Sequence, residues 1–274
     1  GEGALRYNTE GDHNIAFGGA ALYANTEGYR NIAFGNYALK SNTTGNGNIA
    51  SGSSALSENT TGSYNIAIGT EAGGNSTGSN NIAIGNLSGS TLIPGSISDP
   101  LDQYLRGGSG SNNTAIGHKS HVAGQDLSNT TAIGYGAVAS ASNKIRLGNA
   151  DITSIEGQVA FSSSSDRRLK KDIVDTRYGL NTILELRPVD YQMKSNSLEQ
   201  IGFIAQELRP IVPEAVTGIE GDLAKGETLG VTYTTLIPVL TKAIQEQQAL
   251  IEAQNKVIQQ LQKDILILKR KSAK

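Results

Sequence analysis

The sequence predicts a protein that is mainly β with additional α structure. A five-residue motif recurs along the first part of the chain, a heptad pattern runs along the last part, and the composition changes sharply near residue 160. From these observations we expect a trimeric parallel β-roll or solenoid of about 17-residue repeats, a small α+β domain and a C-terminal trimeric coiled coil. The expected boundaries are residues 1–160, 161–234 and 235–274.

The motif in the first part consists of asparagine, isoleucine, alanine, a variable residue and glycine. Successive asparagines are separated by 17, 17, 17 and 16 residues. The five close copies begin at Asn14, Asn31, Asn48, Asn65 and Asn81. A fixed period this short is typical of stacked coils, and one such coil buries too little surface to be stable without its neighbours.

Each repeat is predicted to contain a turn and two short strands. Sequences such as NTEG at Asn8 and NTTG at Asn42 place asparagine and glycine where a tight turn needs a side-chain cap and a positive φ. After the turn, large residues such as Ile15 and Phe17 alternate with small ones, so we expect the large side chains to face inward. The final glycine of the motif should bend the chain into a second strand, which carries Ala-Leu from Ala21.

Two weaker copies of the motif, at Asn113 and Thr130, extend the repeats towards residue 150. The stretch STLIPGSISDPLDQYLRGGSGS, residues 90–111, interrupts them. It is either a plain inserted loop or a lateral loop that contacts a receptor.

The last part predicts a helix over residues 235–270 with five consecutive heptads. Isoleucine occupies every a position, and leucine or glutamine occupies every d position. The seam consists of Ile237, Leu240, Ile244, Gln247, Ile251, Gln254, Ile258, Leu261, Ile265 and Leu268. This pattern predicts a coiled coil, for which we favour a trimer with the glutamines as buried polar layers. The alternative is a single amphipathic helix that docks on its own domain.

Composition excludes several classes of function. The 274 residues carry a formal net charge of −2 and no cysteine, so disulfides and thiolate metal sites are excluded, and no global charge favours nucleic acid or an acidic membrane. No apolar stretch approaches the roughly 20 residues that a membrane helix needs.

His118 and His121 have a spacing sometimes used for metals, but no carboxylate or cysteine cluster accompanies them, so we expect an exposed polar turn and no metal or cofactor. The chain starts without methionine, which suggests a fragment of a longer protein.

The repeats resemble the head repeats of trimeric autotransporter adhesins and of related phage fibre proteins. That resemblance implies trimeric parallel β-rolls. The later motifs SDRRLK, GFIAQE, VPEAV and YTTLIPVLTKAIQEQ, within residues 162–270, resemble the auto-cleaving intramolecular chaperone domain at the C-terminus of phage endosialidase tailspikes and many tail fibres. That resemblance implies in-register trimer assembly followed by self-cleavage at the serine of the SD motif, which is Ser165 here.

The serine needs a base, and no histidine follows residue 160, so Lys170 is the candidate. A lysine must be neutral to accept a proton. Nearby cations and partial burial favour the neutral form, whereas Asp166 opposes it. Neither a helix nor a strand brings residues five apart together, so either the segment turns back on itself or Lys170 reaches the serine of a neighbouring chain. The stretch SSSSDRRLKKDI is otherwise a charged linker.

These patterns together predict a homotrimeric phage tail fibre segment that self-cleaves, with predicted catalytic residues Ser165, Lys170 and Asp166 and no external substrate. We expect it in the virion, after assembly in the host cytoplasm, with a host cell-surface receptor or glycan as a further partner. The alternatives are a bacterial surface adhesin with the same modules and the C-terminal part of a glycan-degrading tailspike.

Overall fold

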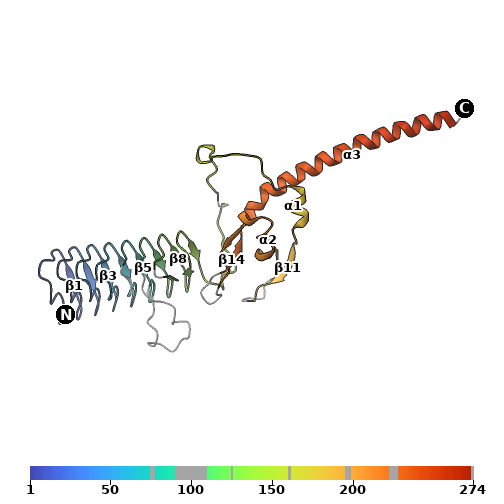
Figure 1. The fold of residues 1–274 in the computed structure, drawn as a ribbon. Coiled ribbons are helices and arrows are strands. Elements are labelled where there is room, and N and C mark those ends of the chain that lie inside the picture. The colour runs from blue at the N-terminus through green and yellow to red at the C-terminus, as the bar shows by residue number, and fades with distance from the viewer. Residues whose placement is uncertain are drawn as a thin grey trace. The chain divides into compact units, whose positions relative to one another are not determined.

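The computed structural model of the chain describes residues 1–74, 78–89, 110–124, 126–159, 162–194, 199–221 and 228–272. The chain divides into two compact units (Figure 1). The first contains Gly1–Ile155, and the second contains Glu156–Glu220 together with Thr228–Lys274. Among the described helices, none has a stretch both long and apolar enough for a bilayer.

The first unit is a parallel β-solenoid, as the repeats predict. Eight short strands form one sheet in which each strand pairs with the equivalent residues of the next coil. The strands are β1 (Ile15–Phe17), β2 (Ile32–Phe34), β3 (Ile49–Ser51), β4 (Ile66–Ile68), β5 (Ile82–Ile84), β6 (Thr114–Ile116), β8 (Thr131–Ile133) and β10 (Ile145–Leu147). Figure 1 shows the strands stacked along one side of the coils.

The prediction that the large strand residues face inward is wrong. Phe17 is 70% exposed and Ile15 is 52% exposed, whereas the central alanine of a strand, such as Ala33, is completely buried. Each coil is so narrow that its interior holds this alanine together with Ala21 and Leu22 or their equivalents from the opposite side. The small residue therefore belongs inside, and the sheet exposes its isoleucines and phenylalanines.

The predicted second strand is also wrong for the first coils. Residues that follow the glycine bend form turns there, in which Ala20 and Leu22 adopt φ of 52° and 51°. These left-handed residues still donate backbone hydrogen bonds to neighbouring coils, from Ala20 N to Glu2 O at 2.8 Å and from Leu22 N to Ala38 O at 3.0 Å. Among the described residues of the solenoid, second strands occur in two later coils, where β7 (His121–Val122) pairs with β9 (Val138–Ala139). The predicted bend itself is confirmed, since Gly18 has a φ of 138°.

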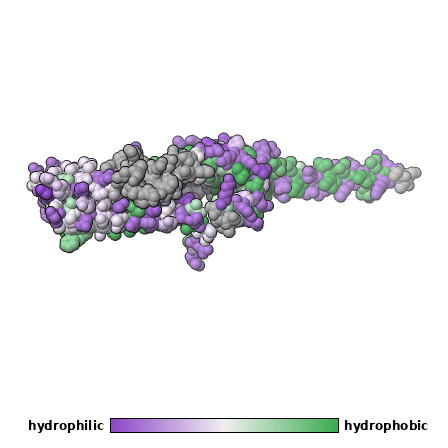
Figure 2. Space-filling model, turned by 90° about the horizontal axis from the view of Figure 1, so that it is seen from below, coloured by the Kyte–Doolittle hydropathy of each residue, from purple (hydrophilic) through white to green (hydrophobic). Residues whose placement is uncertain are grey.

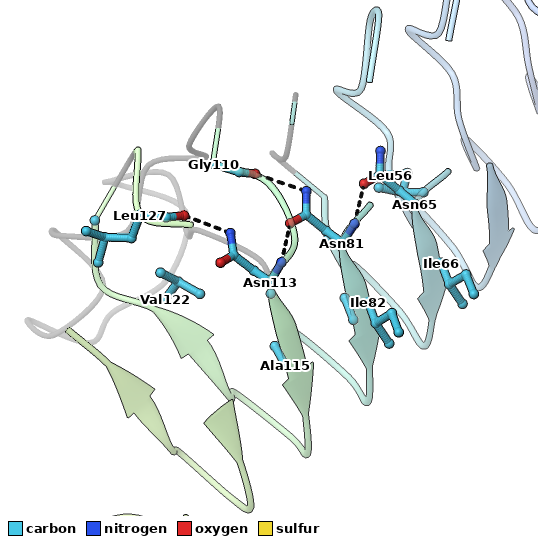
Figure 3. A pocket seen from close by; sticks show the side chains of 14 residues that line it. Leu56, Asn65, Ile66, Asn81, Ile82, Gly110, Asn113, Ala115, Val122 and Leu127 are labelled. Carbon is cyan, nitrogen blue, oxygen red and sulfur yellow. Dashed lines mark hydrogen bonds between the residues drawn. The ribbon is translucent and has the colours of Figure 1, made fainter. Parts of the chain in front are cut away.

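Two columns of asparagine side chains join the coils. In the turn column, Asn42 Nδ2 donates to Asn25 Oδ1 at 2.8 Å and to the Gly45 carbonyl at 3.0 Å. In the column before the strands, each amide oxygen accepts a backbone N–H from the next coil, as Asn65 Oδ1 does from Asn81 at 2.9 Å (Figure 3). The predicted side-chain cap is therefore confirmed. These buried amides replace part of the backbone hydrogen bonding that the turns lack.

The expected positive φ at the turn glycine is wrong. Neither Gly28 nor Gly45 has a positive φ. Glycine is needed there because the coils approach each other closely: a Cβ on Gly28 would lie 2.5 Å from both the Gly45 carbonyl oxygen and Asn25 Oδ1.

The insertion does not break the stack of strands. Ile82 of β5 pairs with Thr114 of β6 in the same register as the preceding coils. Most of the insertion, residues 90–109, lies outside the described residues, so its predicted role as a loop stays a prediction.

The second unit is a small α+β domain with a long C-terminal helix. Its helices are α1 (Leu180–Glu185), α2 (Ala205–Leu208) and α3 (Leu236–Ser272). Its strands form two antiparallel pairs, β11 (Val189–Gln192) with β12 (Glu199–Gly202), and β13 (Val216–Gly218) with β14 (Leu229–Val231). The core consists of Leu208, Val212, Ala215 and Leu236. The helix predicted over residues 235–270 is confirmed as α3, whose two ends lie within two residues of the predicted ones.

Candidate functional site

The stretch around Ser165 contains a single turn of 3-10 helix. This turn, η2 (Arg167–Leu169), begins after Asp166, whose Oδ1 caps it by accepting from Arg168 N at 2.8 Å. The residues on both sides, Asp166 and Lys170, have extended backbones. Ser165 and Lys170 therefore flank one tight turn, and the lysine Nζ donates a hydrogen bond to Ser165 Oγ at 2.7 Å. Of the two geometries that the spacing allows, the structure has the one formed within a single chain.

Asp166 is engaged with an arginine, not with the lysine. Arg168 Nε lies 3.0 and 3.1 Å from the two carboxylate oxygens of Asp166, and its Nη2 lies 2.6 Å from Oδ2. The hydrogen bonds from the Arg168 side chain and then from its backbone lower the pKa of Asp166. Asp166 thus shapes the turn, and its predicted part in catalysis stays a prediction.

Ser165 and Lys170 have the separation that a nucleophile and its base require. In this contact Lys170 Nζ is the donor and Ser165 Oγ is the acceptor. To accept the serine proton, Lys170 must first become neutral, and removal from water favours that form. Residues 162–177 are all exposed in the single chain, so the chain alone does not supply this desolvation.

The downstream end of this exposed segment is fixed by Tyr178. Its ring packs against the core of the second unit, and its hydroxyl donates to Glu214 Oε2 at 2.7 Å. Arg177 donates to the other oxygen of Glu214 at 3.0 Å, and its guanidinium lies 4.8 Å from the centre of the Tyr178 ring. The bond from Tyr178 is the main reason that the pKa of Glu214 is lowered. The VPEAV motif indicated Glu214, but nothing in the sequence indicated Arg177 or Tyr178 as its partners.

The long helix is bonded to the start of α1. Glu246 Oε2 of α3 accepts the backbone N–H of Leu180 at 2.7 Å. Gly179 gives the carboxylate room, because a Cβ there would lie 2.3 Å from the same oxygen. This bond joins α3 directly to the first residue of α1.

A second close approach explains the glycine of the GFIAQE motif. A Cβ on Gly202 would lie 2.1 Å from the hydroxyl of Tyr233, which accepts the backbone N–H of Phe203 at 3.2 Å. The next helix is held by an ion pair between Arg187 and Glu207. The motifs GFIAQE, VPEAV and YTTLIPVLTKAIQEQ are separate in the sequence, and residues of all three pack in the same small core.

The two histidines of the first unit have structural partners. The His118 ring stacks on Tyr135 with ring centres 5.7 Å apart, and His121 Nδ1 lies 3.1 Å from the Lys119 carbonyl oxygen. The prediction of an exposed polar turn is wrong for His121, which belongs to strand β7 and whose burial lowers its pKa. Within the described residues, no group of three or more potential His, Asp or Glu ligands comes together.

A small cavity of about 50 Å³ lies inside the solenoid (Figure 3). It occurs where Gly73 and Gly89 replace the leucine that fills earlier coils, such as Leu56. Its described lining is apolar or amide, with no titratable side chain. We therefore regard it as a packing defect and not as a catalytic site.

Comparison with known proteins gives one family match. The family described as chaperone of endosialidase matches residues 165–217, which begin at Ser165 and include Lys170, Tyr178 and Glu214. No curated protein matches the chain. Residues 165–217 are therefore similar to the chaperone of endosialidase, a family classed as peptidases, and this similarity supports a peptidase-like activity.

Proposed function

We propose that this chain is a phage tail fibre segment whose C-terminal part assembles three copies in register and then cuts the chain at Ser165. The observation that carries the proposal is the contact of 2.7 Å between Lys170 Nζ and Ser165 Oγ, at the start of the matched family segment. The virion is the proposed location, and a host cell-surface receptor or glycan is the proposed external partner.

The exposed seam of α3 supports a homotrimer. Leu236, Val239 and Ala243 are almost completely buried against their own unit, whereas Ile244 on the predicted seam is 64% exposed. Beyond Glu246 the helix is exposed on all sides, and apolar patches recur along it (Figure 2). The helix therefore uses one face to dock on its own domain and leaves the heptad seam available for other copies.

The solenoid presents a second apolar surface. The outward residues of the sheet are isoleucine or phenylalanine in most coils, and they follow one another along the stack. Those at least 37% exposed are Ile15, Phe17, Phe34, Ile49, Ile68, Ile84, Ile116, Ile133, Ile145 and Leu147. A continuous apolar face of this kind is typical of an interface, and we assign it to the neighbouring copies of the homotrimer.

The proposed cleavage follows the usual course of a serine nucleophile. Neutral Lys170 takes the proton of Ser165 Oγ, which attacks a peptide carbonyl carbon. The C–N bond then breaks, the proton passes from the lysine to the leaving amine, and water hydrolyses the resulting ester. In our first choice the broken bond joins Ser165 to Asp166.

Ring size connects the cut site to the chain that attacks. Within one chain, Ser165 Oγ reaches the carbonyl of Ser164 through a five-membered ring, but it reaches its own carbonyl only through a strained four-membered ring. A cut between Ser165 and Asp166 therefore implies attack by the serine of a neighbouring chain. A cut between Ser164 and Ser165 needs no second chain, because the five-membered ring allows attack within the chain.

Intact mass of the freshly expressed chain tests the proposal, because the fragment masses distinguish these two cuts. Ser165→Ala should abolish the cut. Lys170→Arg should nearly abolish it, because arginine keeps the positive charge but cannot become a neutral base. Lys171→Arg is the matched control and should cleave normally. A verified wild-type trimer that stays intact during long incubation would refute self-cleavage and leave this stretch as a linker.

Mixed trimers test the base separately from the attack. Tagged Ser165→Ala chains are assembled with Lys170→Ala chains. Recovery of cleavage means that serine and lysine from different chains act together. No recovery means that the contact seen within one chain is the working pair.

A further inference from the structure

The first four coils contain an unusual arrangement of cations. Residues 1–74 include six acidic residues but only three basic ones, Arg6, Arg30 and Lys40. All three lie against tyrosine rings, at 5.9 Å from the ring of Tyr7, 5.6 Å from that of Tyr29 and 5.4 Å from that of Tyr37, respectively. No described carboxylate forms an ion pair with any of them.

Two of these pairs belong to one continuous surface. Hydrogen bonds between coils place Arg6, Tyr23 and Lys40 at equivalent positions of three successive coils, and Tyr7 meets Tyr23 edge to face at 5.0 Å. With Tyr37 they form what we call the tyrosine–cation patch: Arg6, Tyr7, Tyr23, Tyr37 and Lys40. A hydrogen bond with Tyr7 is the main cause that raises the pKa of Tyr23, so the Tyr23 hydroxyl stays protonated at neutral pH.

The patch remains accessible in the proposed trimer. Its residues precede the asparagine turn of each coil, whereas the apolar strand face follows that turn on the other side of the coil. Tyr7 and Tyr37 are about half exposed, at 51% and 50%. An assembly that buries the strand face leaves these rings in solvent.

We propose that the tyrosine–cation patch binds an acidic oligosaccharide, which would make it the glycan site of the adhesive role in the proposed function. Exposed tyrosine rings offer flat apolar surfaces for the C–H faces of sugar rings, with hydroxyls for their polar edges. Arg6 and Lys40, which no carboxylate neutralises, supply charge for carboxylate groups. They lie two coils apart, about 10 Å at the spacing of neighbouring strands, a span comparable to that of a disaccharide.

The charge pattern favours a glycan over nucleic acid. Two cations among nearby acidic residues neutralise a few sugar carboxylates, but nucleic acid carries one phosphate charge per about 1.7 Å of duplex and requires many more. The purely structural alternative is that each cation only packs on its ring, which predicts no binding.

Titration calorimetry of the verified trimer tests the proposal with two probes of equal length, hexagalacturonate and the neutral maltohexaose. We expect the acidic probe to bind at least about tenfold more tightly than the neutral one, because only it pairs with both cations. Tyr7→Ser should weaken binding of the acidic probe by about tenfold through lost stacking. Lys40→Gln should weaken it by about fivefold through the lost charge.

Arg30→Gln is the matched control, since it removes the same kind of cation–tyrosine pair outside the patch. It should leave binding unchanged. The proposal is overturned by equal affinity for both probes, by no binding of the acidic probe, or by equal effects of Arg30→Gln and Lys40→Gln. Trimer mass and self-cleavage are measured on the same samples, so failure of this inference with an intact, cleaving trimer leaves the proposed function standing.

Discussion

Replacing Asn42 by aspartate tests how far the buried amide columns stabilise the solenoid. The asparagine is completely buried. Its Nδ2 donates to Asn25 Oδ1 and to the Gly45 carbonyl, and its Oδ1 accepts from Asn59 Nδ2 at 2.9 Å. Asn42→Asp keeps the size of the side chain and the acceptor towards Asn59 but removes both donors.

The structure allows the loss to be estimated. Asn25 Oδ1 loses its donor, whereas the Gly45 carbonyl keeps the hydrogen bond from Asn31 Nδ2 at 2.8 Å, so the free energy of unfolding should fall by about 1–3 kcal/mol per chain. Burial and the two facing oxygens raise the pKa of the introduced carboxyl above its unfolded value of about 3.9. A raised folded-state pKa means that the variant is most stable below about pH 4 and loses stability as pH rises through the folded pKa.

Chemical denaturation at equal chain concentration, at pH 4 and pH 7, measures both effects. Asn36→Asp is the matched control: the exposed Asn36 only accepts, from Gly19 N at 2.8 Å, and an aspartate keeps that bond. Its effect should stay within about 0.5 kcal/mol. Equal effects of the two substitutions, or a loss for Asn42→Asp that does not grow with pH, would refute the reasoning.

Three further predictions concern the second unit. Ile258→Asn places an amide on the proposed α3 seam and should lower the molar mass in light scattering from three chains towards one. Gly179→Ala puts a Cβ 2.3 Å from Glu246 Oε2, so the contact between α1 and α3 should open. We expect faster amide exchange in α1 and a loss of about 1–3 kcal/mol in the free energy of unfolding. Arg168→Gln removes the main cause of the low pKa of Asp166, so this carboxyl should titrate at a higher pH by NMR. In the wild type, the contact between Arg168 and Asp166 is present at neutral pH and is lost as pH falls through the lowered pKa of Asp166.

Each of these has a simple control. Lys256→Asn, at an outer heptad position, should leave the trimer intact, and a monomerising effect equal to that of Ile258→Asn would contradict the seam. Ala substitution at Gly221, outside the α1–α3 contact, should leave amide exchange in α1 unchanged. An Asp166 carboxyl whose titration does not respond to Arg168→Gln would show that the Arg168 side chain is not paired with Asp166 as described.

The sequence by itself determined the architecture of both ends of the chain. The spacing of the asparagines fixes the coil length, because strands of neighbouring coils pair at equivalent positions, and the observed register repeats at those intervals. The heptads predicted a long helix, and the structure has α3 over nearly the same residues. The motifs also named Ser165 and Lys170 as the predicted catalytic pair from residue type and order alone, and their catalytic role stays a prediction.

Tertiary structure alone decided which strand face is buried. Alternation with a period of two is the same pattern whether the large or the small residues face inward, so Ile32 and Ala33 could exchange roles without changing the pattern. The choice depends on the room inside the coil, where Leu22 and Leu39 already occupy the interior from the opposite side. The sequence also did not predict the left-handed backbone of these two leucines. Leucine rarely adopts a φ near 51° unless neighbouring coils hold it there.

The contact between Ser165 and Lys170 likewise depended on three-dimensional structure. Regular helices and strands both keep residues five apart from meeting, so the spacing alone left two geometries open. A single 3-10 turn, capped by Asp166 and tied to Arg168, brings the two side chains together within one chain. Such a turn depends on a few local hydrogen bonds and leaves no periodic signal, which is why the sequence named the residues and only the structure brought them together.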